Sequence, residues 1–377
     1  MAEVGYGLLL TTFGVGGLVG TGIAARTGRP PWSWRPPRPP PGVPSPSPDE
    51  STEVDMLPDE LRAALDKAVS GYSPQDLSDS VARLTESYRT GTRGGAHIRS
   101  RADIAAYAAY RMPATYAAAA TAMRQAATLT PGFRPRTHLD VGGGTGAAIW
   151  AADQTWGSIE QVTVIEHDPH IIDLGKRLAR TSESLRGATW RQASVRPGLD
   201  RPPADLVTMS YALGELPRAE RREVVGWLAA DAAMVIVVEP GTPAGYATLA
   251  EAREVLAARG LTIVAPCPHD GRCPIVPGRD WCHFSVRLPR SSLHRRIKAG
   301  TLSFEDEKFS YVAATTAPAE RAAARILRHP VKRKGVVSLR LCTGEDAVSD
   351  VIVSKRQGDL YRAARDADWG DAWPRTE

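Results

Sequence analysis

The stretch Asp140-Val141-Gly142-Gly143-Gly144-Thr145-Gly146 sets the expected fold of this 377-residue chain. It follows the apolar run Thr137–Val141, which predicts a strand, and it precedes a helical run from Ala147 to Ala152. Glycine is needed in such a loop because the backbone must turn sharply and let a ligand approach closer than a Cβ would permit. A strand, a glycine-rich turn and a helix in this order indicate a nucleotide-binding site in an α/β sheet.

A second strand supplies an acidic partner for this loop. Twenty residues after Gly146, the predicted strand Gln161–Glu166 ends in Glu166, whose carboxylate is placed to accept hydrogen bonds from ribose hydroxyls. Parallel strands end at the same edge of a sheet, so the residues that follow the fourth predicted strand belong to the same site. The residues predicted to bind the cofactor are Asp140, Gly142, Gly144, Gly146, Glu166, Ser210 and Tyr211.

The loop is compatible with two classes of cofactor. Gly142, Gly144 and Ala147 satisfy the dinucleotide pattern G-x-G-x-x-A, which keeps an NAD-type enzyme open. The loop also has the form D-x-G-x-G-x-G, which resembles the first motif of class I methyltransferases. The last predicted strands, Leu261–Ala265 and Cys282–Leu288, resemble the hairpin that closes their sheet. This resemblance implies S-adenosylmethionine, and loss of cofactor binding is the third possibility.

Residues 136 to 288 alternate short apolar runs with helical segments. This alternation predicts a doubly wound α/β sheet of seven strands. The predicted strands are Thr137–Val141, Gln161–Glu166, Thr189–Ala193, Leu206–Ser210, Met234–Glu239, Leu261–Ala265 and Cys282–Leu288. Together with the loop, they predict a Rossmann-like class I S-adenosylmethionine methyltransferase fold over residues 131–288.

Two further folded regions are expected on either side of this domain. Residues 56–130 are alanine-rich with apolar residues at helical spacings, which predicts a helical domain in which Pro113 breaks or kinks its helix. Residues 289–377 contain two late strands, Val336–Cys342 and Ala347–Lys355, and form a predicted small basic carboxyl-terminal subdomain.

The first 55 residues have a different character. Val4 to Ala25 is uncharged and long enough to cross a bilayer, although seven of its residues are glycine. Ten prolines follow within residues 30–48, a composition typical of a disordered or polyproline linker. We expect residues 1–55 to be disordered or not to be translated in the cell, with Met56 as an alternative start. A membrane anchor and a cleaved targeting segment are the other interpretations, so the expected location is cytoplasmic or anchored through the amino terminus.

The four cysteines of the chain all lie in its last third. They are Cys267, Cys273, Cys282 and Cys342, with the intervals C-x5-C-x8-C-x59-C, which do not match the paired short knuckles of a zinc finger. Thiolates are soft ligands that a metal or an iron–sulfur cluster can gather from separate loops. We predict a metal site at these four residues. The alternatives are an iron–sulfur cluster, a zinc ion, and four buried thiols that bind no metal.

Basic residues dominate the end of the chain. The formal net charge is +5, and 40 arginines stand against 7 lysines. Arginine favours bidentate phosphate contacts and base stacking, so RNA is a plausible partner, although a GC-rich genome also encodes arginine often. Two basic runs predict an RNA-facing surface, with solvated helix faces as the alternative. They are Arg287, Arg290, His294, Arg295, Arg296 and Lys298, then Arg321, Arg325, Arg328, His329, Lys332, Arg333 and Lys334.

Catalytic residues are not predicted. Catalysis in this fold usually takes place after the fourth strand, where Ser210 to Leu216 lacks the Asn/Asp-Pro-Pro-aromatic tetrad of amino-methylating enzymes. Pro266-Cys267 resembles the nucleophile motif of cytosine-C5 methyltransferases, but it follows the sixth strand instead of the fourth. Glu215 and Glu239 are the available acidic candidates for a general base.

Several motifs beyond the glycine loop carry a family resemblance. They are Ser210–Leu216 (SYALGEL), Glu239–Pro243 (EPGTP), Cys267-Pro268-His269-Asp270 through Cys273-Pro274, Asp280–Phe284 (DWCHF) and Lys334-Gly335 before Cys342. Together they resemble the methyltransferase-like assembly factors of the mitochondrial ribosomal small subunit and their bacterial relatives. The resemblance extends from about Leu57 to the tail at Trp369 to Trp373 and excludes residues 1–55.

The resemblance implies both a cofactor and a partner. It implies a [4Fe–4S] cluster held by Cys267, Cys273, Cys282 and Cys342, association with small-subunit ribosomal RNA, and a role in assembly more than in methylation. We therefore predict a monomeric, S-adenosylmethionine-binding, iron–sulfur assembly factor of the small ribosomal subunit, with no DNA partner. The alternatives are an active rRNA methyltransferase and a zinc-stabilised RNA-binding module without catalysis.

Overall fold

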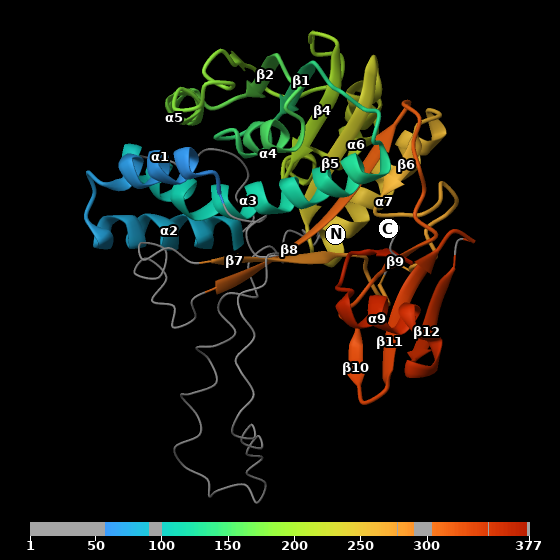
Figure 1. Ribbon diagram of the computed structural model, residues 1–377. Coiled ribbons are helices and arrows are strands. Elements are labelled where there is room, and N and C mark those ends of the chain that lie inside the picture. Colours follow the sequence, from blue (N-terminus) through green and yellow to red (C-terminus); the bar gives the residue numbers. More distant parts are fainter. Residues whose placement is uncertain (1–56, 90–99, 277, 290–303, 346, 375–377) are drawn as a thin grey trace, which may run out of the picture.

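The computed structural model describes residues 57–89, 100–276, 278–289, 304–345 and 347–374. A large mixed sheet is covered by helices, and a smaller antiparallel sheet follows it towards the carboxyl end (Figure 1). The apolar segment Val4 to Ala25 lies outside the described residues, as do Arg290, His294, Arg295, Arg296 and Lys298 of the first basic run. Among the described helices, none combines the length and the apolar character that a membrane span requires.

The large sheet confirms the predicted α/β architecture. Its strands follow the order β3-β2-β1-β4-β5-β8-β6, and β7 pairs with β8. Strands β1 to β5 are parallel, whereas β8 is antiparallel to β5, β6 and β7. The strands are β1 Thr137–Val141, β2 Gln161–Glu166, β3 Thr189–Gln192, β4 Ala204–Ser210, β5 Ala232–Pro240, β6 Thr262–Ala265, β7 Phe284–Pro289 and β8 Phe304–Thr315.

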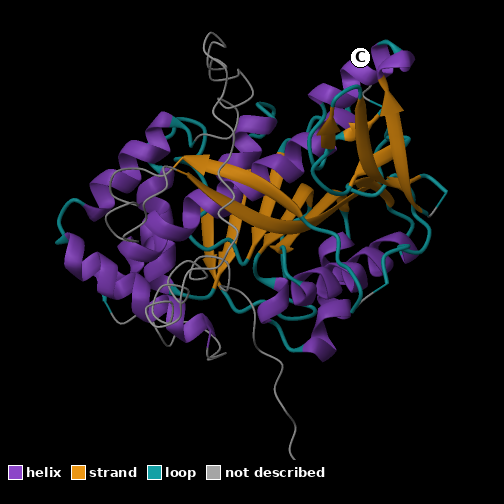
Figure 2. Cartoon of the chain, turned by 90° about the horizontal axis from the view of Figure 1, so that it is seen from below, coloured by secondary structure: helices purple, strands orange, loops and turns teal. Residues whose placement is uncertain are grey.

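Strand β8 corrects the predicted end of this sheet. The expected count of seven strands is wrong, because the sheet has eight and β8 lies between β5 and β6. The second half of β8, from Phe309, is buried between its neighbours, while its first half extends past the sheet and pairs with β7 (Figure 2). That first half contains the charged sequence Glu305 to Lys308, which does not have the apolar pattern of a core strand.

Helix α3 joins the amino-terminal helices to the sheet. It lies along the sheet in Figure 1, and its alanines belong to the same buried core as Leu139 of β1. Of the break or kink predicted at Pro113, the break is wrong, because α3 continues through it. Proline removes one backbone hydrogen bond, and burial of the helix against the sheet offsets that loss. The helices are α1 Asp59–Val69, α2 Pro74–Arg89, α3 Arg101–Leu129, α4 Ala147–Thr155, α5 Pro169–Ala179, α6 Arg218–Ala229 and α7 Pro243–Ala258.

The carboxyl-terminal subdomain forms a second sheet with a small core of its own. Its strand order is β10-β11-β9-β13, with β12 paired to β11, so the two predicted late strands correspond to the β11–β12 hairpin. It lies on the side of the large sheet away from α1 and α2 (Figure 1). Its elements are β9 Ala324–Ile326, β10 Val331–Arg333, β11 Val336–Thr343, β12 Val348–Ser354, α9 Asp359–Asp366 and β13 Ala372–Trp373.

Candidate cofactor site and four-cysteine cavity

The glycine-rich loop joins β1 to α4 at the carboxyl edge of the large sheet. Gly142, Gly144 and Gly146 have φ angles of 65°, 56° and 91°, a region that residues with side chains rarely adopt. A Cβ on Gly143 would lie 2.5 Å from Cγ1 of Val164. Gly142, Gly144 and Gly146 turn the chain, and Gly143 packs it against β2. The conformation of the loop therefore requires glycine at these positions.

The side chain of Asp140 packs against the glycine-rich loop. The residue is fully buried, and its Oδ1 accepts a hydrogen bond of 2.7 Å from the hydroxyl of Thr208. Its Oδ2 has no hydrogen-bond partner among the described residues and would lie 2.6 Å from a Cβ on Gly143. Burial raises the pKa of Asp140 to about 7. Asp140 therefore acts on the loop through packing and contacts no solvent.

Glu166 connects the end of β2 to the glycine loop. Its Oε2 accepts a hydrogen bond of 3.0 Å from the backbone N–H of Gly144, and its Oε1 accepts from the backbone N–H groups of His167 and Asp168 at 2.7 and 3.0 Å. Burial opposes ionisation of Glu166, but these hydrogen bonds and the side chain of His167 hold its pKa below the usual value. An ionised acceptor therefore lies beside the loop.

The end of β4 packs against the same loop. A Cβ on Gly142 would lie 2.7 Å from the Cβ of Ala212, which shows how closely the two turns approach. The hydroxyl of Ser210 is buried and has no hydrogen-bond partner among the described residues. The seven predicted cofactor residues thus lie where β1, β2 and β4 end, at one edge of the sheet.

The side chain of Tyr211 is directed towards β8. Its φ angle of 58° is unusual for a bulky residue, and its backbone N–H donates to the carbonyl of Val238 at 2.7 Å. Its hydroxyl donates to Oε1 of Glu307 at 2.9 Å, and the guanidinium carbon of Arg111 lies 5.3 Å from its ring centre. Arg111 and Glu307 were not predicted from the sequence. They engage the Tyr211 side chain at the edge where we expected it to face a cofactor.

Glu239 ends β5 beside these turns and is almost completely buried. Its Oε1 accepts a hydrogen bond of 3.1 Å from the backbone N–H of Gly214. Burial raises its pKa from 4.5 to about 7. Between these two pH values, the folded protein binds a proton that the unfolded chain has released. Stability therefore falls as the pH rises through this range.

We expect Glu239→Gln to flatten this pH dependence. Wild type should lose on the order of 3 kcal/mol of unfolding free energy through this carboxyl group between pH 4.5 and 7, because each pKa unit corresponds to about 1.4 kcal/mol. Urea unfolding of both proteins at pH 5 and pH 8 measures the difference. Glu254→Gln is the matched control, since that carboxylate is exposed on α7. Equal pH dependence of wild type and the Glu239 variant would contradict the effect of burial.

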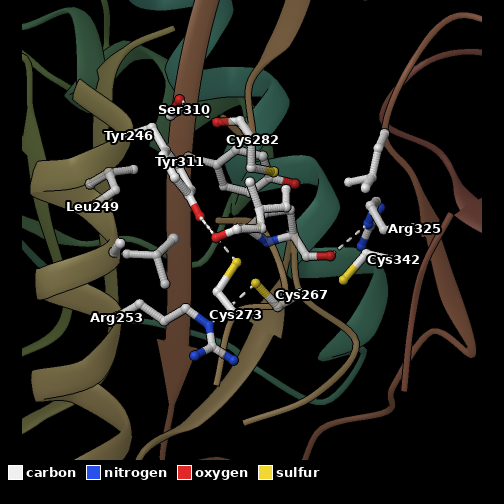
Figure 3. A pocket seen from close by; sticks show the side chains of 15 residues that line it. Tyr246, Leu249, Arg253, Cys267, Cys273, Cys282, Ser310, Tyr311, Arg325 and Cys342 are labelled. Atoms are coloured by element: carbon white, nitrogen blue, oxygen red, sulfur yellow. Dashed lines mark hydrogen bonds between the residues drawn. The ribbon is translucent and has the colours of Figure 1, made fainter. Parts of the chain in front are cut away.

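The four cysteines come from separate elements and line one cavity (Figure 3). Cys267 follows β6, Cys273 and Cys282 lie in the segment between β6 and β7, and Cys342 lies on β11. The cavity therefore lies where the large sheet meets the carboxyl-terminal subdomain. Other side chains that line it come from α7, β8, β9 and the residue after β9: Tyr246, Leu249, Arg253, Ser310, Tyr311, Val312, Arg325 and Leu327.

Polar groups surround the sulfur atoms. Nε of Arg253 donates to Sγ of Cys267 at 3.3 Å, and the hydroxyl of Tyr246 lies 3.2 Å from Sγ of Cys273. Burial raises the pKa of Cys267, and it raises the pKa of Cys282 well above the usual value, with the charges of the other three cysteines adding to the effect. The thiols of Cys267 and Cys282 are therefore protonated near pH 7, and a metal that binds these two thiols displaces their protons.

Four thiols are the kind of donor set that an iron–sulfur cluster or a zinc ion takes. Among the described side chains, no group of three or more His, Cys, Asp or Glu is placed to hold one ion. A tetrahedral zinc ion with Zn–S bonds of about 2.3 Å needs its sulfurs about 3.8 Å apart. A [4Fe–4S] cluster binds each of its four thiolates through a different iron, so its ligands surround a wider space.

The structure also corrects the predicted basic surface. Arg325 was expected to face RNA, but its side chain is completely buried in the wall of the cysteine cavity. Arg287, Arg321 and Arg328 form ion pairs with Asp306, Asp270 and Asp280, respectively. These pairs lie within the chain, so they leave fewer cations for a partner than the sequence indicated.

Two groups of cavity residues, on α7 and on β9, were not predicted although the sequence carries a signal for each. On α7, Tyr246, Leu249 and Arg253 are spaced by three and four residues, which places them on one face of the helix. Arg325 lies between Ala324 and Ile326 in a short buried strand. An arginine in an apolar pattern is a candidate for an internal role.

Residues 101–374 match the family model of the mitochondrial small ribosomal subunit protein Rsm22. The chain belongs to the Rsm22 family. The matched region runs from the start of α3 to the end of β13 and includes the glycine loop and all four cysteines. The resemblance inferred from the sequence motifs is therefore confirmed.

Relatives of this Rsm22-family chain include two mitochondrial proteins. The human mitochondrial ribosome assembly protein METTL17 is 32% identical over 289 residues, which cover 71% of this chain and 62% of the human protein. The Schizosaccharomyces pombe mitochondrial Rsm22-cox11 tandem protein 2 is 27% identical over 289 residues, covering 63% of this chain and 38% of that protein. The chain thus spans less than two thirds of the length of each relative.

Solved structures similar to this Rsm22-family chain include two methyltransferases. An O-methyltransferase family protein from Burkholderia thailandensis is 11% identical, covers 63% of this chain and 68% of its own, and has a TM-score of 0.39. Magnesium protoporphyrin IX methyltransferase from Synechocystis is 13% identical, covers 54% and 83%, and has a TM-score of 0.34. Both scores are low, so the description of the fold rests on the strand order.

Proposed function

We propose that this Rsm22-family protein is an assembly factor of the small ribosomal subunit that holds a [4Fe–4S] cluster, binds S-adenosylmethionine and contacts small-subunit rRNA. The observation that carries the proposal is the cavity in which four thiols from separate elements meet at the junction of the two sheets. The name of the human relative, a ribosome assembly protein, supports the same role.

The cluster would be held by Cys267, Cys273, Cys282 and Cys342. Its contribution would be structural, because Cys342 belongs to β11 while the other three follow β6 or precede β7. A ligand shared by these segments joins the carboxyl-terminal subdomain to the large sheet. The donors Arg253 and Tyr246 support sulfur anions in this cavity. Zinc on the same thiolates is the alternative.

S-adenosylmethionine would bind at the glycine loop. When bound, it supplies a methyl group on a positively charged sulfur. The backbone at Gly144 is open to a ligand, because a Cβ there would meet no atom within 4 Å, and the ionised carboxylate of Glu166 would accept hydrogen bonds from ribose hydroxyls. The buried hydroxyl of Ser210 is available to a ligand at the same edge.

The structure gives less support to methyl transfer than to cofactor binding. Tyr211 follows β4, where methyl acceptors usually bind in this fold, and its hydroxyl is hydrogen-bonded to Glu307. An active rRNA methyltransferase remains the enzymatic alternative. Comparison of rRNA methylation between deletion and wild-type cells separates the two, since an assembly factor leaves the methylation pattern unchanged.

The surface proposed to contact rRNA lies on the carboxyl-terminal subdomain. Lys332 and Arg333 are exposed on β10, and Lys334 is exposed in the turn that follows. Cations that project from a short hairpin can reach phosphates without disturbing the core. A tagged copy of the protein is expected to co-sediment with small-subunit precursors. Sedimentation only as free protein would refute the assembly role.

Neutralising this hairpin is expected to weaken RNA binding. The double variant Lys332→Gln/Arg333→Gln should lose about fivefold in affinity for a small-subunit rRNA fragment, and the slope of log K against log salt should fall by about 1.4, or about 0.7 for each lost charge. Fluorescence anisotropy at several salt concentrations measures both quantities. Arg340→Gln is the control, because Arg340 is exposed on the neighbouring strand and lies 3.5 Å from Asp350. An equal change in both proteins would exclude the hairpin as the contact.

A further inference from the structure

Arg325 joins three distant parts of the chain in the wall of the cysteine cavity. Its Nε donates to the carbonyl of Pro266 at 2.8 Å, next to Cys267. Its Nη1 donates to the side chain of Gln125 on α3 and, at 2.9 Å, to the carbonyl of Gly370 in the tail. The guanidinium therefore connects the cysteine loop, the long helix and the carboxyl-terminal subdomain.

The remaining donors of this guanidinium have no partner within the part of the chain that the structure describes. Arginine carries five N–H groups, and the contacts of Nε and Nη1 use three of them. Nη2, which carries the other two, is buried and has no hydrogen-bond partner among the described residues. The whole side chain is 0% exposed. A buried cation with unsatisfied donors is unfavourable unless an anion approaches it.

The cavity offers a place for that anion. Arg325 lines it together with the four cysteines, and Figure 3 shows Arg325 on the same side as Cys342. A cluster bound by four thiolates carries net negative charge, and hydrogen bonds to its sulfurs tune its reduction potential. Arg253 differs from Arg325, because its Nη2 already donates to the carbonyl of His269 at 2.7 Å.

We propose that Nη2 of Arg325 donates to the cluster and that this contact couples occupancy of the cavity to docking of the carboxyl-terminal subdomain. The proposal rests on the proposed function, since it needs an anionic cluster. With the cluster in place, the guanidinium is neutralised and its three protein contacts hold the segments together. Without it, the buried charge is unbalanced and those contacts weaken.

The test compares protein with its cluster and protein from which iron has been removed anaerobically. Hydrogen exchange reports on β9 and β13, and the reduction potential reports on the cluster. In wild type, removal of the cluster should speed exchange in both strands about tenfold. In Arg325→Gln, exchange should be fast in both states and the reduction potential more negative, because a positive donor that favours the reduced cluster is lost.

Two further variants separate this role from simple packing. Arg325→Lys keeps the positive charge but cannot make all three contacts. It should therefore have the reduction potential of wild type, but it should lack the tenfold ratio between the exchange rates without and with the cluster. Arg340→Gln removes an exposed cation from β11 of the same subdomain and should keep the ratio. If Arg325→Gln does not fold, the lysine variant decides. A tenfold ratio retained in Arg325→Lys would overturn the proposal.

Failure of this proposal can be told apart from failure of the proposed function. Wild-type protein that takes up no iron and sulfide would end both. Wild-type protein with a cluster, whose exchange rates are the same in the two states or whose potential does not respond to Arg325→Gln, would end only the proposal for Arg325.

Discussion

Cys282→Ser is expected to give a colourless protein that no longer co-sediments with the small ribosomal subunit. Cys282 lies between β6 and β7 and lines the cavity with the other three cysteines. The serine hydroxyl is a harder and weaker ligand for the iron of a cluster than the thiolate it replaces. Anaerobically purified wild type should be brown, with about four iron and four sulfide per chain, and the variant should retain less than about a tenth of both. Metal analysis and visible absorption measure these contents.

Ser310→Ala is the matched control for this experiment. Ser310 lines the same cavity, and its hydroxyl donates to the carbonyl of Cys282 at 2.7 Å. Loss of that hydrogen bond should reduce stability by about 1 kcal/mol and leave the iron content unchanged. Colourless wild type with stoichiometric zinc would establish the zinc alternative instead.

Gly144→Arg is expected to reduce the affinity for S-adenosylmethionine by more than about a hundredfold. A Cβ on Gly144 would meet no atom within 4 Å, so the space above the loop is open to a ligand, and an arginine would fill it. Its φ of 56° adds backbone strain of about 1 kcal/mol for any residue other than glycine. Isothermal titration calorimetry measures binding of the cofactor.

Gly157→Arg controls for adding a long cation beside a glycine. Gly157 also has open space around its Cβ and follows α4 at the end opposite the loop. This variant should bind S-adenosylmethionine like wild type. If wild type itself shows no binding, the loop has lost its cofactor. Binding of NAD in its place would identify the dinucleotide alternative.

The local sequence pattern was sufficient to predict the bounds of strands that are apolar and largely buried. The bounds predicted for β1 and β2 agree with the structure, and the positive φ angles at Gly142, Gly144 and Gly146 explain why that loop was recognisable. β8 was missed because half of it is charged and extends past the sheet. Strand pairing between distant segments, and not local composition, places β8 between β5 and β6.

The cysteines could be grouped from the sequence, but their surroundings could not. Four soft ligands form a recognisable set at any spacing. Arg325 looked like one member of a basic run, since charge alone does not distinguish a solvated cation from a buried one. Its role depends on contacts with Gln125 and Gly370, which lie far from it in the sequence.

The position of β8 also imposes an order on synthesis. Within the described residues, β6 is joined to the large sheet through β8, which begins about forty residues later in the chain. A nascent chain emerges from its amino end, so β6 and the first three cysteines leave the synthesising ribosome before the strand that docks them exists. Cys342 emerges later still. A cluster held by all four thiolates, as proposed, could therefore form only after Cys342 has emerged, and a product terminated before β8 would leave β6 unpaired.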